Sequence, residues 1–550
     1  MSRTQPVADA VGTILAELGV RQAFGLIGSG NFRFTNALVR AGASYVAARH
    51  EGAAMTMADA YARCTGEVPV CTVHQGPGVT NLTTGLAEAA KSRTPALVVA
   101  ADTAASAIRS NFRIDQAGLA TAVGAIPERV YGPQTAAADC ARALHRARVE
   151  RRPVVLMLPL DVQAAPAAEA EPLSPAPLHP VRPAAAAVSA AADLLTAAER
   201  PLVIAGRGAL LANAREPLEE LSDLLGALLA TSAVAHGLFE GSPWTLGVSG
   251  GFASPTASEL ITESDVVLSV GATLNMWTTR HGRLLGPAVQ LIQIDHEAEA
   301  IGAQHRLAAA IVGDAAESAR ALVAELRGRG HRRTGRRTPG VEQRIRTGSW
   351  RDEPYEDAGT RDRIDPRTLS IAVDRLLPPE RTIAVDSGHL VGWPPMYLRV
   401  PDARGFVFTQ AFQAVGLGLA TAIGAAVARP DRLTVAALGD GGALMGLSEL
   451  ETVARLSLRM VILVYNDAAY GAEVHHFAAE GEEVDLVRFP DTDFAALARA
   501  AGLDGITVRR EADLGALQDW LEGPDRPALL IDAKVVEGVV AQFLEDAFGH

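Results

Sequence analysis

Two polar residues in the C-terminal third of the chain end apolar stretches and could bind a cation. The apolar run 433–440 ends in Asp440, and the run 460–467 ends in Asn466 and Asp467. Because strands of a parallel sheet end at one edge, we expect Asp440 and Asn466 to converge there. Mg²⁺ prefers oxygen ligands and usually retains phosphate oxygens and water. Asp440, Asn466 and a loop carbonyl, assigned to Ala468, are therefore the predicted metal ligands.

Glycines beside Asp440 indicate that the expected cation bridges a phosphate group. The sequence Gly439-Asp440-Gly441-Gly442 is followed by a helical stretch through about residue 454. Glycines let backbone N–H groups approach a diphosphate, and a following helix directs its positive end toward it. The tetrapeptide alone is also typical of a flexible turn, but the strand, helix and second strand around it favour a diphosphate site.

A second candidate is Glu51, in the sequence RHEGAA at 49–54, which runs into a helical stretch. The HExxH zinc motif is excluded because its second histidine would stand at Ala54. Taken alone, a glutamate that opens a helix is a first-turn charge favoured by the helix dipole. Its role therefore depends on what the rest of the chain forms.

Composition limits the class of protein that must position these residues. The chain has 550 residues, and chains usually divide into domains beyond about 250–300 residues, so we expect three domains. With 48% apolar and 21% charged residues it is globular, and a net charge of −13 argues against nucleic acid as a partner. Lysine occurs only at Lys91 and Lys534, which restricts Schiff-base chemistry. Three cysteines without a CxxC pair favour a reducing cytoplasm.

Apolar runs that alternate with helical stretches predict parallel sheets covered on both faces. We therefore predict an α/β protein of three doubly wound domains, with boundaries at 1–165, 188–326 and 364–550. The proline- and alanine-rich stretch 166–187 and the arginine-rich stretch 327–363 are interpreted as surface linkers, the second as a solvated connector rather than a nucleic-acid site. The N-terminus lacks a signal-peptide pattern and is predicted to form the first helix.

One segment is long enough to cross a membrane. Residues 405–428 carry no charge, but they include two glutamines and four glycines. This composition favours a buried glycine-rich loop followed by a closely packed helix, so no membrane association is expected.

Taken together, these motifs resemble the thiamine diphosphate enzymes of the acetohydroxyacid synthase, pyruvate oxidase and benzaldehyde lyase superfamily. The resemblance covers essentially the whole chain and is carried by AFGLIG at 23–28, RHEGAA at 49–54, GPGVTN at 76–81, ERRPVVLMLPLDV at 150–162, GLGLATAIGA at 416–425, GDGG at 439–442 and ND at 466–467. It implies that the first domain binds the pyrimidine of the cofactor, the third binds its diphosphate, and the middle one has a related fold. It also implies a homodimer or a dimer of dimers, because the two cofactor-binding domains meet across subunits in this superfamily.

The resemblance also assigns roles to residues. Glu51 would hydrogen-bond N1′ of the aminopyrimidine and favour the 4′-imino form, which removes the C2 proton of the thiazolium. Asn81 would contact the pyrimidine, the carbonyl of Gln413 would hold the 4′-amino group, and Val415 would support the bent cofactor. The usual second asparagine of the signature is Asp467 here. The remaining expected cofactor contacts are Ser387, Gly388, His389, Asp440, Gly441, Gly442, Asn466, Tyr470 and Gly471.

Fewer residues point to the substrate. The superfamily forms an enamine from a 2-oxo acid or aldehyde, which is then protonated, oxidised or added to a second carbonyl. No tandem histidine follows Asp102, which argues against simple decarboxylation. Gln116 resembles the glutamine that faces the donor in carboligases, although it would equally well cap local backbone. His475 and His476 could relay protons, or lie on the surface or cap a helix. Further substrate-binding candidates are Ser29 and Asn31.

The leading prediction is a Mg²⁺- and thiamine diphosphate-dependent carboligase that resembles acetolactate synthase and acts on small 2-oxo acids or aldehydes. The alternatives are a 2-oxo acid decarboxylase, a benzaldehyde lyase-like carboligase or lyase, a serine hydrolase built on Ser249, and a cofactor-binding scaffold with little turnover. Ser249 lies in a GxSxG pattern for which we expect neither a preceding strand nor a following helix. The stretch 271–277 departs from the family's flavin-binding run, which argues against FAD despite the GxG at 206–208.

Overall fold

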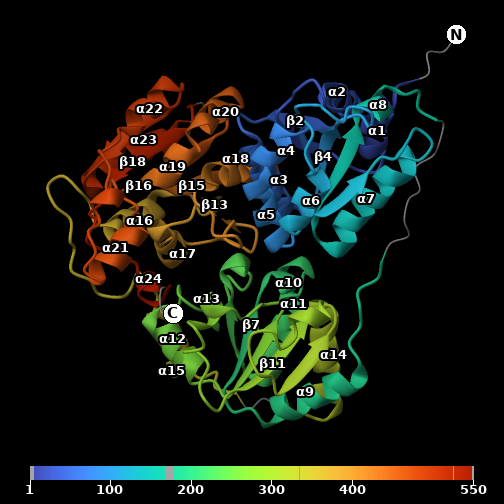
Figure 1. The fold of residues 1–550 in the computed structure, drawn as a ribbon. Coiled ribbons are helices and arrows are strands. Elements are labelled where there is room, and N and C mark those ends of the chain that lie inside the picture. Colours follow the sequence, from blue (N-terminus) through green and yellow to red (C-terminus); the bar gives the residue numbers. More distant parts are fainter. Residues whose placement is uncertain (1–4, 169–177, 333–334, 524–525, 548–550) are drawn as a thin grey trace.

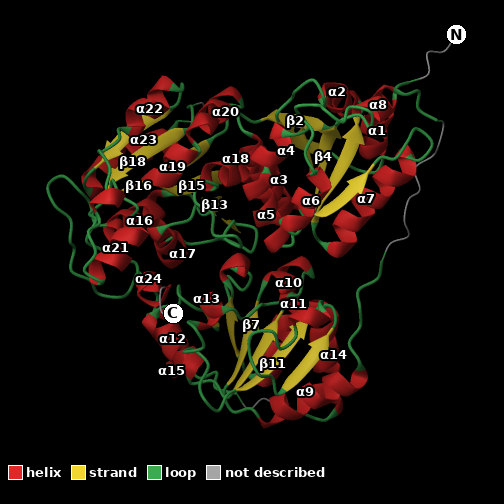
Figure 2. Ribbon diagram, viewed as in Figure 1, coloured by secondary structure: helices red, strands yellow, loops and turns green. Residues whose placement is uncertain are grey.

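The computed structural model describes residues 5–168, 178–332, 335–523 and 526–547. Its strands form three six-stranded sheets, every paired strand is parallel, and helices lie on both sides of each sheet (Figures 1 and 2). Most strands are buried along their whole length, as the continuous apolar runs predict. The predicted fold class, three doubly wound α/β domains, is confirmed.

The first sheet has the strand order β2-β1-β3-β4-β6-β5. Its strands are β1 (Gln22–Gly25), β2 (Ser44–Ala47), β3 (Val70–Val73), β4 (Ala96–Asp102), β5 (Ile126–Arg129) and β6 (Pro153–Pro159). Its helices are α1 (Val7–Glu17), α2 (Phe32–Arg40), α3 (Glu51–Thr65), α4 (Pro77–Asn81), α5 (Thr83–Lys91), α6 (Gln116–Ala122), α7 (Ala136–Glu150) and α8 (Leu160–Ala164).

The central sheet has the order β12-β11-β10-β7-β8-β9, which read from the other edge is the 3-2-1-4-5-6 order of dinucleotide-binding folds. Its strands are β7 (Pro201–Ala205), β8 (Leu228–Thr231), β9 (Thr245–Val248), β10 (Val266–Val270), β11 (Gln290–Asp295) and β12 (Ala309–Val312). Its helices are α9 (Ala185–Ala197), α10 (Arg207–Leu211), α11 (Arg215–Leu225), α12 (Pro255–Thr262), α13 (Met276–Thr279), α14 (Ala315–Gly328) and α15 (Pro339–Arg346).

The third sheet has the order β14-β13-β15-β16-β18-β17, which repeats the order of the first sheet strand for strand. Its strands are β13 (Arg381–Val385), β14 (Phe406–Phe408), β15 (Leu433–Gly439), β16 (Met460–Asn466), β17 (Asp504–Val508) and β18 (Leu529–Lys534). Its helices are α16 (Pro366–Leu376), α17 (Trp393–Tyr397), α18 (Gly418–Ala428), α19 (Asp440–Met445), α20 (Leu450–Arg455), α21 (Gly471–Ala479), α22 (Phe494–Ala500), α23 (Gly515–Glu522) and α24 (Gln542–Ala547), with the short 3₁₀ turns η3 (His389–Gly392) and η4 (Leu447–Glu449).

The two outer domains share one apolar core. Buried residues of the first sheet, α3, α18 and the third sheet belong to a single cluster, and α3 lies directly against α18 (Figure 1). A Cβ at Gly424 of α18 would collide with the backbone of Met57 in α3, so only glycine permits this close approach. The cofactor-binding halves predicted from the sequence are therefore packed together within one chain.

The uncharged segment 405–428 divides into β14, a loop and the 11-residue helix α18. In the part of the chain that the structure describes, no helix is long and apolar enough to cross a membrane. The three cysteines, Cys64, Cys71 and Cys140, are free and buried.

The structure also describes parts of the two predicted linkers. The stretch 166–187 lies partly outside the described residues and runs into α9, which begins at Ala185. The stretch 327–363 contains the helix α15.

Candidate active site

A cavity lies at the carboxyl edge of the third sheet, where the polar residues predicted from the sequence were expected to converge. The ends of β15 and β16, the loop before α18 and the turn η3 line it. Its polar walls include Asp440, Asp467 and His389, and its apolar walls include Val415 and Met445.

Asp440 and Asp467 form an acidic pair in this cavity. Burial raises the pKa of Asp440 to about 6. Burial and then the charge of Asp440 raise the pKa of Asp467 to about 7. Two neighbouring carboxyl groups whose pKa values are both raised form a site that a divalent cation would stabilise, because the cation favours both charged forms.

Asn466 does not belong to this pair. It is fully buried, and its Nδ2 donates to Asp532 Oδ1 at 2.9 Å and to the carbonyl of Thr492 at 3.1 Å. Lys534, 3% exposed, completes this polar cluster through an ion pair of 2.9 Å with Asp532. The side chain of Asn466 therefore faces the neighbouring strand β18.

The backbone carbonyl of Ala468, the third predicted ligand, also has a hydrogen-bond partner elsewhere. The carbonyl of Ala468 accepts a hydrogen bond of 2.8 Å from the backbone N–H of Phe489, while Ala469 is the residue that lines the cavity. The cavity thus brings Asp440 together with Asp467 and Ala469, whereas Asn466 and Ala468 are not among the residues that line it.

Three glycines let the backbone approach the centre of the cavity. A Cβ at Gly441 would lie 2.6 Å from the Tyr470 ring, and one at Gly442 would collide with the carboxylate of Asp386. A Cβ at Gly471 would lie 2.5 Å from Asp467 Oδ2. The predicted contacts Gly441, Gly442, Tyr470 and Gly471 all line the cavity, and its glycines leave backbone N–H groups accessible to an anionic group.

Sequence reasoning missed Asp386, which follows β13 and is fully buried. Its carboxylate accepts from the N–H of Ser387 at 2.8 Å and from that of Gly416 at 2.9 Å, and burial raises its pKa to about 6. It thereby fixes the backbone beside Val415, which is 41% exposed in the cavity wall. An aspartate directly after an apolar strand was the available signal.

Gln413 lies in the same loop and has a left-handed backbone with φ of 59°. Such a conformation costs a non-glycine residue about 1 kcal/mol or more, so surrounding contacts must hold it. The hydroxyl of Ser387 lies 3.5 Å from the Gln413 carbonyl. Ser387 and Gly388 also line the cavity, as expected.

His389 is 8% exposed in the cavity wall, and its pKa is lowered to about 3 by burial and by the neighbouring His475. Its Nε2 accepts from the N–H of Ala541 at 2.9 Å. The ring is therefore neutral and carries its proton on Nδ1.

His475 and His476 are not among the residues that line the cavity. The ring of His475 lies behind His389, with centroids 4.4 Å apart, and burial lowers its pKa. His476 faces Glu480 one helical turn away, at 3.7 Å. The structure therefore places His475 against His389 of the cavity wall and His476 beside Glu480, and neither lines the cavity.

Glu51 and Asn81 meet in the N-terminal domain. Glu51 begins α3, is 7% exposed, and accepts a 3.0 Å hydrogen bond from Asn81 Nδ2. Glu449 of the C-terminal domain accepts from the N–H groups of Arg49 and His50 at 2.9 and 3.1 Å, which fixes the turn before Glu51. Neither Glu51 nor Asn81 lines the cavity of the third sheet.

The side-chain amide of Gln116 is hydrogen-bonded to backbone groups of the N-terminal domain. It is buried, its Oε1 accepts from the N–H of Gly76 at 2.9 Å, and its Nε2 donates to the carbonyl of Ala101 at 3.0 Å. The side chain of Asn31 likewise accepts from the N–H of Gly28 and donates to the carbonyl of Leu26 and the hydroxyl of Thr72. The hydroxyl of Ser29 lies 3.4 Å from His74 Nε2.

Ser249 follows the strand β9, contrary to the expectation that no strand precedes it. It is 3% exposed, and its hydroxyl donates to the carbonyl of Thr278 at 2.9 Å. A nucleophilic serine needs an exposed hydroxyl beside a base. This geometry assigns Ser249 to the packing of the central domain.

Ser249→Ala is expected to leave turnover unchanged and to cost about 1 kcal/mol in the free energy of unfolding, the usual value of one hydrogen bond. Steady-state kinetics and urea unfolding of both proteins measure the two effects. Loss of turnover by a variant that folds normally would restore the hydrolase interpretation.

The GxG of the central domain packs against the stretch 271–277, since a Cβ at Gly208 would lie 2.7 Å from Gly271 Cα. Arg207 between the two glycines extends into the N-terminal domain, where it donates to the carbonyl of Ser92 at 2.6 Å. The expectation that this domain binds no FAD stays a prediction.

Comparison with known proteins identifies the same three-part organisation. Family models described as the N-terminal TPP binding domain, the central domain and the C-terminal TPP binding domain of thiamine pyrophosphate enzymes match residues 5–122, 188–322 and 386–531.

Curated relatives resemble the chain over most of its length. An acetolactate synthase large subunit of Parasynechococcus marenigrum is 31% identical over 84% of this chain and 76% of that protein. A sulfoacetaldehyde acetyltransferase of Castellaniella defragrans is 28% identical over 98% of this chain and 95% of that protein. A probable 2-ketoarginine decarboxylase of Pseudomonas aeruginosa is 31% identical over 94% of this chain and 91% of that protein.

Proposed function

The chain belongs to the thiamine pyrophosphate enzyme family, and from this premise we propose that it is a Mg²⁺-dependent carboligase similar to acetolactate synthase. It would join the acyl unit of a small 2-oxo acid to a second carbonyl compound. Thiamine diphosphate supplies the electron sink for this chemistry when it is bound. The observation that carries the proposal is the convergence of Asp440 and Asp467 in a glycine-lined cavity.

The residues of the cavity fit a diphosphate and its cation. We assign the cation to the carboxylates of Asp440 and Asp467 and the carbonyl of Ala469, in place of Asn466 and Ala468. Phosphate oxygens and water would complete an octahedral site. The backbone at Gly441, Gly442 and Gly471, where a side chain would collide with Tyr470, Asp386 and Asp467, would contact the diphosphate.

Glu51 would act on the pyrimidine ring, where a carboxylate can hold and exchange a proton at a ring nitrogen. Asn81 positions it through the hydrogen bond of 3.0 Å. The carbonyl of Gln413 and the side chain of Val415, at the edge of the cavity, would orient the same ring.

A second copy of the chain would complete the site, because Glu51 does not line the cavity of its own chain. Loops at the carboxyl edge of the first sheet expose Ile27, Ile108 and Phe112 at 38%, 70% and 44%. The edge of the third sheet exposes Leu444 and Met445 at 46% and 58%. Apolar surfaces at both edges support a homodimer or a dimer of dimers. The three buried thiols suit a reducing compartment, for which we propose the cytoplasm.

The low pKa of His389 favours ligation over release of an aldehyde. Release of an aldehyde requires an acid that protonates the reacting carbon. The carboxyl groups of Asp440 and Asp467 are assigned to the cation, and His389, the one histidine among the described residues that line the cavity, carries no imidazolium proton at neutral pH because its pKa is about 3. A 2-oxo acid decarboxylase is the second candidate, supported by the name of the Pseudomonas aeruginosa relative.

The proposal is tested by incubating the protein with thiamine diphosphate, Mg²⁺ and a panel of 2-oxo acids, each with and without an added aldehyde or second oxo acid. We expect CO₂ release coupled to a new carbon–carbon product. Stoichiometric CO₂ and free aldehyde, with no ligated product, would identify the decarboxylase instead. No CO₂ and no ligation from any pair would reject both.

Binding of Mg²⁺ with the cofactor is expected to weaken as the pH falls through about 7 and then about 6. Only the carboxylate forms of Asp467 and Asp440 bind the cation, so protons compete with it below these values. Calorimetric titration of Mg²⁺ across this range measures the effect. Asp467→Asn should remove the part of this pH dependence that lies near pH 7. A Mg²⁺ affinity that does not change with pH in the wild type would contradict the assignment of the cation to Asp440 and Asp467.

The same pKa values predict the stability of the metal-free protein. Because both folded-state pKa values are raised, the stabilisation from this pair is complete below the unfolded pKa of about 4 and is lost as the pH rises through about 6 and 7. Mg²⁺ and the cofactor should therefore raise the melting temperature most at alkaline pH.

A further inference from the structure

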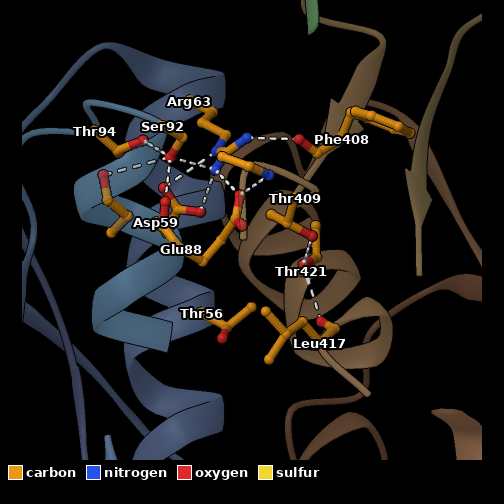
Figure 3. Close-up of polar contacts among 12 residues, drawn as sticks. Thr56, Asp59, Arg63, Glu88, Ser92, Thr94, Phe408, Thr409, Leu417 and Thr421 are labelled. Carbon is orange, nitrogen blue, oxygen red and sulfur yellow. Dashed lines mark hydrogen bonds and ion pairs between the residues drawn. The ribbon is translucent and has the colours of Figure 1, made fainter. Parts of the chain in front are cut away.

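A buried charge cluster joins the N-terminal domain to the loop that carries Gln413 (Figure 3). Its centre is Arg63 of α3, which forms two hydrogen bonds of 2.7 and 3.1 Å with Asp59 and one of 2.8 Å with Glu88 of α5. The side chains of Arg63, Asp59 and Glu88 are 9%, 0% and 1% exposed. Charges buried this deeply are retained only when every polar atom has a partner.

The partners come from the C-terminal domain. Arg63 Nη1 donates to the carbonyl of Phe408, the last residue of β14, at 2.7 Å. The two carboxylate oxygens of Glu88 accept from the backbone N–H groups of Ala411 and Phe412 at 3.1 and 2.6 Å. Glu88 therefore replaces the backbone partners that this loop would otherwise need.

Arg207 of the central domain brings a second positive charge to the two carboxylates of the cluster. Arg207 donates to the carbonyl of Ser92 and to Thr94 Oγ1 at 2.6 and 2.9 Å, and the carboxylates of Asp59 and Glu88 act on it electrostatically. Two arginines and two carboxylates thus meet where all three domains join. This arrangement explains why a basic residue, Arg207, stands within the GxG of the central domain, and the explanation needs no bound nucleotide.

The loop is held at both ends. Glu88 fixes residues 411 and 412, and Asp386 fixes Gly416. Between these anchors lie Gln413, whose backbone is left-handed, and Val415. A strained carbonyl can be aimed at a ligand only if the backbone on each side cannot relax.

We propose that Glu88 is a positioning residue for the cofactor: its carboxylate holds the 411–412 backbone so that the carbonyl of Gln413 faces the aminopyrimidine. This inference rests on the proposed function. It predicts that loss of Glu88 weakens binding of the cofactor before it changes the handling of substrate by the loaded enzyme.

The test is Glu88→Gln in the full chain. The amide keeps one acceptor and turns an NH₂ group toward a backbone donor, so one buried N–H loses its partner. We expect the dissociation constant for thiamine diphosphate with Mg²⁺ to rise about tenfold or more, as loss of one such bond implies, while KM for the substrate at saturating cofactor stays close to that of the wild type.

Asp59→Asn is the matched control. It makes the same charge change in the same cluster but removes no bond to the loop. We expect it to lower the melting temperature as Glu88→Gln does and to leave the affinity for thiamine diphosphate near the wild-type value. Equal cofactor affinities for folded Glu88→Gln, Asp59→Asn and wild type would overturn the proposal. If Glu88→Gln does not fold, Glu88→Asp, which keeps the charge on a shorter side chain, replaces it under the same criterion.

Amide hydrogen exchange on the cofactor-free wild type is an independent measurement. The N–H groups of Ala411 and Phe412 should be protected because buried Glu88 accepts from them, and rapid exchange at both would also overturn the proposal. Wild-type protein that shows this protection but binds no thiamine diphosphate would instead reject the proposed function.

Discussion

Glu51→Gln is expected to lower kcat by about 10²–10⁴-fold, the usual scale for removing an acid–base group. An amide cannot take up or release the proton that a carboxylate exchanges with a ring nitrogen. Cofactor binding should persist, because glutamine has the same shape and its carbonyl can still accept from Asn81 Nδ2. Turnover of a 2-oxo acid at saturating thiamine diphosphate measures the loss, and exchange of the cofactor's C2 proton into deuterated water should slow in parallel.

Glu449→Gln is the matched control for Glu51. Glu449 is 1% exposed and accepts from the backbone on the turn before Glu51, so both variants change a buried carboxylate to an amide in one region. We expect the control to lose stability and to keep most of its turnover. Unchanged turnover in Glu51→Gln would refute the assigned role, and equal losses in both variants would reduce it to a structural one.

Asp467→Ala, like Asp440→Ala, is expected to abolish retention of thiamine diphosphate that depends on Mg²⁺, with affinity falling by more than about 100-fold. Changes in residues that only support a metal ligand already cost about 10–100-fold, and here a ligand itself is lost. Cofactor content after gel filtration with and without Mg²⁺ measures the effect.

Asp467→Asn separates the oxygen ligand from the charge. The amide retains an oxygen for the cation, so we expect most of the cofactor to be kept, in contrast to Asp467→Ala. An Asp467→Ala protein that copurifies with a full complement of cofactor would contradict the proposed ligand set and favour Asn466 as the ligand.

The fold was predictable because central strands of the two outer sheets, such as β4, β6 and β16, are almost entirely apolar, as parallel strands buried on both faces require. The strand β9 was missed for the opposite reason. Thr245–Val248 is short, lies at the edge of its sheet and is only partly buried, so it carries no comparable pattern.

The cavity lies at the sheet edge that the sequence indicated, but at the end of β16 it is lined by Asp467 rather than by Asn466. Successive side chains of a strand point to opposite faces, so a choice between Asn466 and Asp467 depends on which of them still belongs to the strand. Asn466 does, and it pairs with Asp532 across β18. No sequence pattern indicated that Glu88 and Arg63 bind the C-terminal domain, because their partners near residue 410 are more than 300 positions away in the chain.

The identical strand order of the two outer sheets gives α3 and α18 the same place in their domains, each following the edge strand of its sheet. The contact between them is therefore a junction of equivalent parts, built like the interface of a symmetric dimer but within one chain. The two edges carry different residues: Glu51 follows the edge strand β2 of the first sheet, and Asp440 and Asp467 follow β15 and β16 of the third. A sliding of α3 along α18 would displace the edge that carries Glu51 relative to the edge that carries the acidic pair, so this helix pair fixes how one chain presents its two edges to a second copy.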